Sequence, residues 1–337
     1  MAKRVTYFDW LRGAATFAVV ILHMLNMMLS THPVSDFPLA MVVIWTQLQL
    51  VFTRWAVPAF FMVSGALLLD PARDVSWNKV ALYVARVAGA LLVFCCVYTC
   101  VSANTITLSA IVTGLGKAFT RGSWDHLWYV YALIGLYLLT PILSAYVRAT
   151  TPEVQRTTLL VLSVPTLLVR SINAATGLGL ASVAWVTSSV FYYLLGAYAH
   201  QYVSLDRRIV ALGLGSLAAG LVSIVFLVTL TGIYPNWFIK PECPLVTLWS
   251  LLVFVAAKRF LNGRTVPPLL ELASGHSLAI YLVHPIVLVV LYRRLWWMPY
   301  ETLPPVIFEI VAFALVLGTT VPVAMLLKRV PGLRRIL

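Results

Sequence analysis

The chain has 337 residues, of which 61% are hydrophobic and only 10% are charged. Soluble domains carry roughly 25% charged residues, so this composition excludes water as the main solvent of the chain. The formal net charge is +13, but the basic residues are spread over short loops and form no patch with interleaved aromatic side chains. We therefore expect no nucleic-acid partner.

Apolar runs near the ~20 residues that cross a hydrocarbon core recur along the whole sequence. They predict an all-α polytopic membrane protein of about ten transmembrane helices, with residues 1–337 forming a single integral membrane domain. The stretch 106–120 is shorter and amphipathic, and we expect it to lie on the membrane surface or to re-enter. The predicted spans cover residues 11–29, 42–69, 80–101, 127–147, 157–178, 183–203, 209–232, 244–261, 272–292 and 305–327.

The basic residues sort by side of the membrane once these spans are drawn. Most of the 24 lysines and arginines fall in loops on the same side as the N-terminus. By the positive-inside rule, that side faces the cytoplasm, and both termini are predicted there. We therefore expect a multi-pass protein of the bacterial inner membrane. The opposite side holds only Lys117, Arg121, Lys240, Arg293 and Arg294.

Four arginines lie within or at the ends of predicted spans: Arg12, Arg54, Arg86 and Arg170. A charge at this depth is costly unless it faces the bundle interior, a wet cavity or a partner. Each is therefore a candidate functional residue. For Arg54 and Arg170 we expect structural pairing.

Arg12 and His23 in the first predicted span form the most informative pair. They are eleven residues apart, which at 3.6 residues per turn leaves an angular offset of about 20° and an axial separation of about 16 Å. A cation at the helix entrance and an imidazole deeper on the same face suit a donor with a phosphorylated head and a reactive far end. In the alternative interpretation, Arg12 is a topological anchor and His23 is an interhelical contact.

Four segments carry a resemblance to a known family. They read YFDWLRGAATFAVVILH, RWAVPAFFMVSGALLL, HLWYVYALIGLYLLTPIL and SLAIYLVHPIVL, and they occur in this order along the chain. Together they resemble the membrane-bound acyltransferase 3 family, and most closely its stand-alone type that O-acetylates surface polysaccharides such as enterobacterial common antigen. The resemblance covers essentially the whole chain.

On the donor side, the resemblance implies that Arg12 binds the acyl donor and that His23 takes part in acyl transfer. Asp9 fills the family's preceding acidic position, where it either pairs with Arg12 or caps the helix. The family's Phe-Phe-x-x-Ser-Gly motif matches Phe60, Phe61, Ser64 and Gly65. Ser64 is therefore a candidate donor-binding residue, although small residues here also permit close helix packing.

The resemblance also implies a pair of cations that holds the donor's phosphates where the third span leaves the cytoplasm. Family members commonly have Arg-x-x-Arg there, whereas this chain has Lys79, Tyr83 and Arg86. Tyr83 stands where one arginine is expected. We predict that Arg86 keeps the phosphate role and that Lys79 supplies the second charge.

Five residues are candidates for binding the acyl acceptor. His126 opens the fourth span beside Trp128 and Tyr129, a cluster that suits a sugar but also resembles an ordinary interfacial aromatic belt. Tyr281 and His284 lie in the ninth span and are candidates for the same role. The glutamate that many family members place after this histidine is absent, so a second acid or base is not predicted there.

The predicted reaction is transfer of an acyl group, most simply acetyl, from cytoplasmic acyl-coenzyme A to a hydroxyl of a surface or lipid-linked glycan. His23 acts either as general base or as a transient acyl carrier. The expected partners are acyl-coenzyme A, the glycan acceptor and the lipid bilayer, with no metal ion. The alternative from another class is a transporter or exporter of small solutes or amino acids, since intramembrane charges also mark transport paths.

Overall fold

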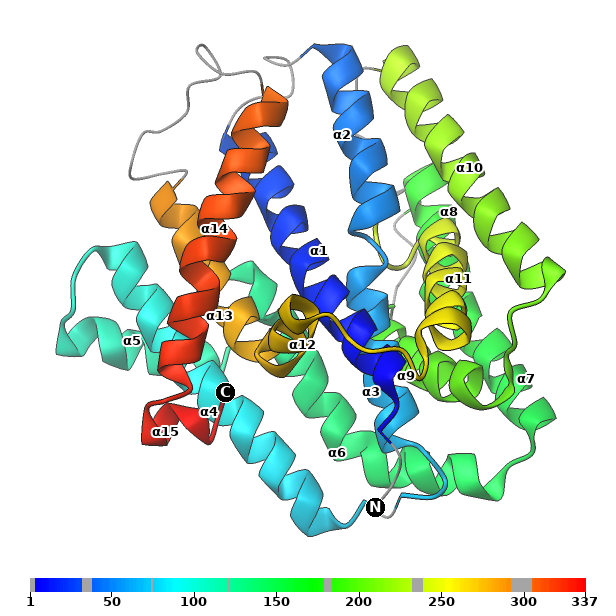
Figure 1. Cartoon of the computed structure of the whole chain (residues 1–337), viewed down its shortest axis with the longest axis horizontal. Helices are drawn as coiled ribbons and strands as arrows, with labels where there is room; N and C mark the ends of the chain where they lie inside the picture. Colours follow the sequence, from blue (N-terminus) through cyan, green and yellow to red (C-terminus); the bar gives the residue numbers. More distant parts are fainter. Residues whose placement is uncertain are drawn as a thin grey trace. The chain divides into compact units, whose positions relative to one another are not determined.

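The computed structural model describes residues 4–31, 38–73, 75–120, 122–178, 184–231, 239–291 and 305–337 (Figure 1). The protein is 83% helical, and the part of the chain just delimited holds no strand. The predicted all-α class is confirmed. Two compact units are present: Met1–Asp70 with Ala149–Ser277, and Pro71–Arg148 with Leu278–Leu337. Arg121, Arg293 and Arg294, on which the topology prediction partly depends, lie outside the described residues.

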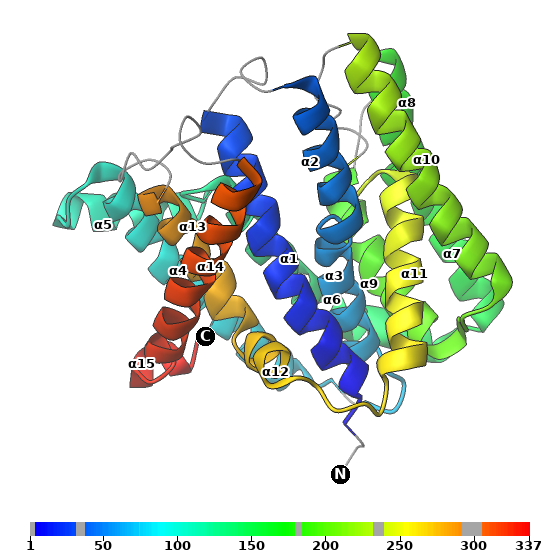
Figure 2. The same ribbon diagram turned by 45° about the horizontal axis from the view of Figure 1, so that its top comes forward.

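The first unit is built on α1, a single helix that runs without a break through the first predicted span. Helices α10 and α11 pack against each other and run side by side in both views (Figure 1, Figure 2). α1 packs on α3, α11 and α12, and α3 packs on α9. The helices of this unit are α1 (Thr6–Thr31), α2 (Leu39–Phe52), α3 (Ala56–Leu68), α7 (Pro152–Ser163), α8 (Val169–Thr176), α9 (Ala184–Tyr202), α10 (Arg207–Thr231), α11 (Pro244–Leu261) and α12 (Pro268–Gly275).

The second predicted span, 42–69, is broken rather than continuous. α2 ends at Phe52 and α3 begins at Ala56. Pro58 explains the break, because proline has no N–H to donate within a helix and is tolerated in a first turn. Arg54 therefore lies at a helix break within a membrane span.

The second unit contains a helical hairpin made of α4 and α5, which pack closely on each other. α4 ends at Ala103, and the next residue, Asn104, adopts the left-handed conformation with φ 54° and so turns the chain back. Thr107 then caps α5 by accepting a hydrogen bond from the Ala110 N–H at 3.2 Å. The helices of this unit are α4 (Trp77–Ala103), α5 (Leu108–Ala118), the single turn Asp125–Leu127, α6 (Trp128–Ala149), α13 (Ser277–Val289), α14 (Pro305–Leu327) and α15 (Pro331–Arg334).

Within the described residues, seven helices are long and apolar enough to cross a membrane, or eight if α12 and α13, broken at His276, count as one span. Each corresponds to a predicted span, and the protein is a polytopic membrane protein. α5 has 11 residues and is too short to cross, as the sequence predicts for this stretch. The seven are Thr6–Met27, Leu39–Leu68, Trp77–Ala103, Asp125–Ala149, Arg207–Thr231, Pro244–Leu261 and Ile310–Leu327.

The predicted spans 157–178 and 183–203 are helical but are not among those seven. The first corresponds to α7 and α8, joined by a π-helical segment at Val164–Leu168 that accommodates Pro165. Arg170 places a charge within this predicted span, and Gln155 and Arg156 lie just before it. The total of about ten spans and the cytoplasmic placement of both termini therefore stay predictions.

Candidate functional site

Asp9 is a buried carboxylate, only 8% exposed, that binds three partners near the start of α1. Its Oδ1 accepts hydrogen bonds from Arg12 Nη2 at 2.8 Å and from Ser274 Oγ at 3.0 Å, and its Oδ2 accepts one from Arg4 Nε at 2.8 Å. Arg4 also pairs with Glu271 of α12 at 2.7 Å. The structure thus forms the predicted Asp9–Arg12 pair, and α1 begins at Thr6, so Asp9 is not a helix cap.

Arg12 combines a fixed position with access. Its guanidinium is oriented by Asp9, yet 36% of its side chain is exposed. Next to it, Gly13 lies against the main-chain carbonyl of Leu270, where a β-carbon would collide with the oxygen. This close approach of α1 and α12 brings Ser274 and Glu271 to the arginine. A partly exposed, oriented guanidinium is well suited to bind an anionic group.

His23 lies on the same unbroken helix as Arg12, so the predicted common face and axial separation of about 16 Å hold. The residue is half-buried, and one helical turn further along α1 the Asn26 Oδ1 lies 3.5 Å from Arg54 Nη2. Either predicted role of His23 requires the neutral ring with its lone pair.

Arg54 is held at the break between α2 and α3. Its Nη2 donates to Gln49 Oε1 and makes a longer contact of 3.5 Å with Asn26 Oδ1 of α1. Asn26 lies one helical turn beyond His23. The structure therefore shows the expected pairing of Arg54, while Arg170 Nε on α8 makes no hydrogen bond within the described residues.

Ser64 makes a hydrogen bond within its own helix. Its Oγ donates to the main-chain carbonyl of Phe60 at 2.8 Å within α3. Gly65 lies against the carbonyl of Tyr193, and Gly196 of α9 lies against the carbonyl of Met62, so a β-carbon at either position would collide with main chain. This geometry supports the interpretation that small residues of the motif allow α3 and α9 to pack closely.

Lys79 and Arg86 lie seven residues apart on α4 and thus on one face of that helix. Both are exposed, and Arg86 Nη2 donates to the main-chain oxygen of Leu337 at 2.5 Å. Burial and the charge of Arg86 lower the pKa of the nearby Lys328. Tyr83, on the same side of α4, packs its ring on Tyr137 with centroids 5.6 Å apart.

His126 sits in the single turn before α6, inside a cluster of aromatic rings in the second unit. Its Nε2 is 3.0 Å from the hydroxyl of Tyr98, a fully buried residue of α4. Tyr98 stacks on Trp124, with centroids 4.4 Å apart and planes 7° apart. The main-chain carbonyl of His126 accepts a hydrogen bond from the Tyr281 hydroxyl.

The other predicted acceptor residues join this cluster to different degrees. The ring of Tyr281 lies 5.5 Å from those of His126 and Tyr129, and His284 lies 6.5 Å from His126. His284 is fully buried, and its Nδ1 donates to the carbonyl of Ile280 at 2.9 Å. Trp128 is 38% exposed and packs edge-on against Tyr129.

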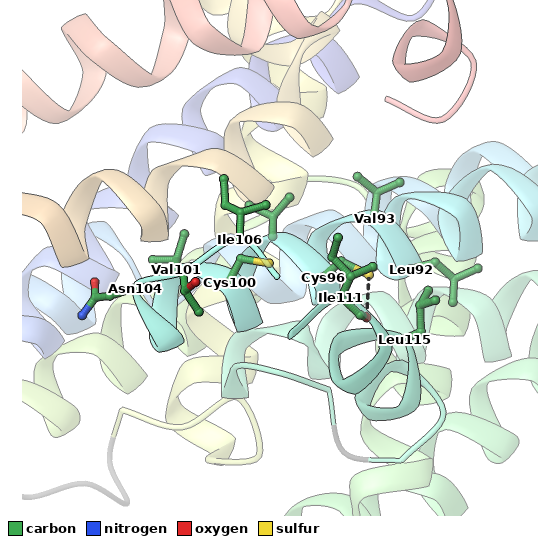
Figure 3. Close-up of a pocket in the computed structure, with 11 residues that line it drawn as sticks. Leu92, Val93, Cys96, Cys100, Val101, Asn104, Ile106, Ile111 and Leu115 are labelled. Atoms are coloured by element: carbon green, nitrogen blue, oxygen red, sulfur yellow. Dashed lines mark hydrogen bonds between the residues drawn. The ribbon is translucent and has the colours of Figure 1, made fainter. Parts of the chain in front are cut away.

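A separate apolar groove of about 690 Å³ lies between α4 and α5 (Figure 3). Cys96 lines it and bonds weakly to the Ile111 carbonyl at 3.5 Å. The groove contains none of the predicted site residues, and Tyr98 of α4 does not line it either. Its lining comprises Leu92, Val93, Cys96, Val97, Cys100, Val101, Asn104, Thr105, Ile106, Ile111 and Leu115.

Sequence reasoning missed Tyr98, Trp124, Asn26 and Ser274. None of them carries a local signal, because each is defined by a partner distant in sequence or by a second helix. No group of three histidine, cysteine, aspartate or glutamate side chains suited to a metal ion occurs among the residues that the structure describes.

Residues 5–329 match the family model of the acyltransferase 3 family, which is described as an acyltransferase domain. The chain belongs to this family. The match spans nearly the whole chain and lends support to acyl transfer, not to the transporter alternative. No curated protein and no solved structure matches the chain. At the position where the sequence resemblance leads us to expect an arginine, the chain has Tyr83.

Proposed function

We propose that this acyltransferase moves an acyl group, most simply acetyl, from cytoplasmic acyl-coenzyme A to a hydroxyl of a surface or lipid-linked glycan on the other side of the bacterial inner membrane. The observation that carries the proposal is the Asp9-oriented guanidinium of Arg12 on the same unbroken helix as His23. Family membership supplies the reaction class.

On the donor side, an extended pantetheine arm is of the right order to cover the ~16 Å between the two α1 residues. Arg12 binds a phosphate of coenzyme A, and His23 meets the thioester. Lys79 and Arg86 are the further cations proposed for the donor's phosphates, and Ser64 is kept as a donor-side candidate whose main role is helix packing.

The transfer exchanges one acyl bond for another. The carbonyl carbon–sulfur bond of the thioester breaks, a carbonyl carbon–oxygen bond forms, and the hydroxyl proton ends on the coenzyme A thiolate. His23 mediates this either by accepting and returning the proton or by carrying the acyl group on its ring.

The acceptor is proposed to bind at the aromatic cluster of the second unit. Stacked and edge-on rings with hydroxyl and imidazole groups present the apolar faces and hydrogen-bonding atoms that a sugar needs. The residues proposed to contact it are His126, Trp128, Tyr129, Tyr281 and His284.

The proposal is tested with purified protein in sealed vesicles that receive acetyl-coenzyme A labelled in the acetyl group. The expected result is label in an added lipid-linked glycan, removable by mild base as an ester is. Mass spectrometry of surface polysaccharide from a deletion strain and its parent identifies the natural acceptor, and an unchanged acetyl content together with no label transfer contradicts the proposal.

A further inference from the structure

One carboxylate holds two guanidinium groups beside the start of α1. Asp9 Oδ2 accepts a hydrogen bond from Arg4 Nε at 2.8 Å and lies 2.8 Å from Arg4 Nη2, while its Oδ1 accepts one from Arg12 Nη2 at 2.8 Å. Ser274 Oγ of α12 donates to the same carboxylate at 3.0 Å. Arg4 and Arg12, eight positions apart in the sequence, are therefore neighbouring cations within the first unit.

The segment that carries Arg4 is fixed to the end of α11. Thr6 Oγ1 donates to the main-chain carbonyl of Leu261 at 3.2 Å and accepts from the Gly263 N–H at 2.7 Å. Together with the contacts to Asp9, these bonds define the position of Arg4 before any ligand arrives. A ligand that binds Arg4 therefore does not have to order this side chain first, which favours binding.

Both arginines keep N–H donors for a ligand. A guanidinium has five N–H groups. Arg4 uses Nε and Nη2 for its two carboxylate partners, and its Nη1 has no partner in the part of the chain that the structure describes. Arg12 uses Nη2 for Asp9. Because 60% of the Arg4 side chain and 36% of the Arg12 side chain are exposed, both cations can be reached from outside the protein.

The two carboxylates that bind Arg4 differ in exposure. The side chain of Asp9 is 11% exposed, whereas that of Glu271, whose Oε1 lies 2.7 Å from Arg4 Nη2, is 50% exposed. An ion pair that faces water is weak. A phosphate oxygen and a carboxylate oxygen are also alternative partners for the same guanidinium. A phosphate can therefore replace Glu271 on Arg4 while Asp9 continues to hold the arginine in place.

We propose that Arg4 is a second donor-binding residue, which binds the diphosphate of acyl-coenzyme A together with Arg12 and exchanges Glu271 for a phosphate oxygen. This inference rests on the proposed function and deepens it by naming the phosphates recognised at the start of α1. Two neighbouring guanidiniums offer one cation to each of two adjacent phosphates. The pantetheine arm is attached directly to this diphosphate, so its thioester end extends toward His23 on the same helix.

The first test compares donors that differ in their phosphates. These are acetyl-coenzyme A, its analogue without the 3′-phosphate, and S-acetyl-pantetheine, which has no phosphate. Loss of an exposed charge-assisted hydrogen bond predicts that Arg4→Gln raises the KM of the first two donors roughly fivefold to tenfold and leaves kcat unchanged. The KM of S-acetyl-pantetheine stays as in the wild type. Arg4→Lys, which keeps the charge but not the planar fork, recovers part of the loss.

Two further variants control for charge and for structure. Arg208→Gln removes an exposed arginine at the start of α10 in the same unit and leaves every donor KM unchanged. Glu271→Gln removes the carboxylate that competes with the phosphate, so it lowers the KM of acetyl-coenzyme A roughly twofold to fivefold, as expected for an exposed ion pair. If the Arg4–Glu271 pair only joined α1 to α12, its loss would not improve donor binding.

The second test measures binding without transfer, by calorimetric titration of coenzyme A into protein in lipid nanodiscs. Arg4→Gln should weaken binding by the same factor as it raises the donor KM. An equal defect with S-acetyl-pantetheine, or a binding constant unchanged in Arg4→Gln, overturns the role of Arg4. A defect that disappears with the donor lacking the 3′-phosphate overturns the assignment to the diphosphate.

The outcomes also separate this inference from the function on which it rests. A wild type that binds coenzyme A but transfers no acyl group contradicts the proposed function, and the titrations then decide on Arg4. A wild type that does not bind coenzyme A at all overturns both.

Discussion

The guanidinium of Arg12 and the carboxylate of Asp9 lie 2.8 Å apart on consecutive turns of α1, and the carboxylate is the more buried partner. Ser274 Oγ of α12 also donates to this carboxylate, so Asp9 is held in place by a second helix while it orients Arg12. Because the buried carboxylate of Asp9 orients the partly exposed guanidinium, Arg12 can bind an anion without a rearrangement of the helix.

Asp9→Asn tests this orientation. The amide keeps the size of the side chain but removes the charge that fixes Arg12, so we expect the KM for acetyl-coenzyme A to rise about tenfold, as for loss of a charge-assisted hydrogen bond. Initial rates at varied donor concentration measure the effect. Glu271→Gln is the control, because Glu271 pairs with Arg4 and not with Arg12. Equal donor KM values in the two variants would mean that Asp9 has no special effect on Arg12.

Arg54→Met tests the pairing at the helix break. Gln49 is fully buried, and loss of the guanidinium leaves its Oε1 without that donor, at a cost of roughly 1–3 kcal/mol in the free energy of unfolding. The unfolding temperatures of Arg54→Met and the wild type in detergent measure this loss of stability. The double variant with Gln49→Leu removes both polar groups and should recover much of the loss. Strict additivity of the two changes would show that the pair is not coupled.

Gly65→Ala tests the close packing of α3 on α9. The added methyl group meets the Tyr193 carbonyl, so the helices must separate, and we expect destabilisation of at least the 1–3 kcal/mol typical of overpacking. Gly215→Ala on α10 meets nothing within 4 Å and should be neutral or slightly stabilising. If both variants unfold at the same temperature, the α3–α9 contact is looser than described.

Arg86→Gln tests the phosphate role proposed for α4. A donor that lacks the 3′-phosphate of coenzyme A should have a higher KM than acetyl-coenzyme A in the wild type, and this difference should shrink in Arg86→Gln. Lys117→Gln, on α5, is the charge-matched control and should keep the wild-type difference. A difference that persists unchanged in Arg86→Gln assigns that phosphate to another cation.

Features encoded within one helix could be predicted from the sequence. The common face of Arg12 and His23 follows from helical periodicity. The family resemblance offered the Asp9–Arg12 pair, with a helix cap as the alternative. The short α5 also follows, because its apolar run is too brief to cross a membrane. These features need no knowledge of which helices become neighbours.

Features that depend on neighbouring helices could not be predicted in the same way. The partner of Tyr98 is a main-chain carbonyl 184 residues later in the chain, which has no signature in sequence. The break at Arg54 was concealed by a continuous apolar run, although Pro58 is its local cause. Ser274 reaches Asp9 because Gly13 allows α12 to approach α1 closely.

The most direct test of the central claim compares His23→Ala and His23→Gln with the wild type in sealed vesicles, with labelled acetyl-coenzyme A as donor and a lipid-linked glycan as acceptor. We predict that donor binding persists while transfer falls to about one thousandth of the wild-type rate or less, in line with the loss of a general base. Transfer at near wild-type rates by folded, correctly inserted His23→Ala protein would contradict a catalytic role for this residue.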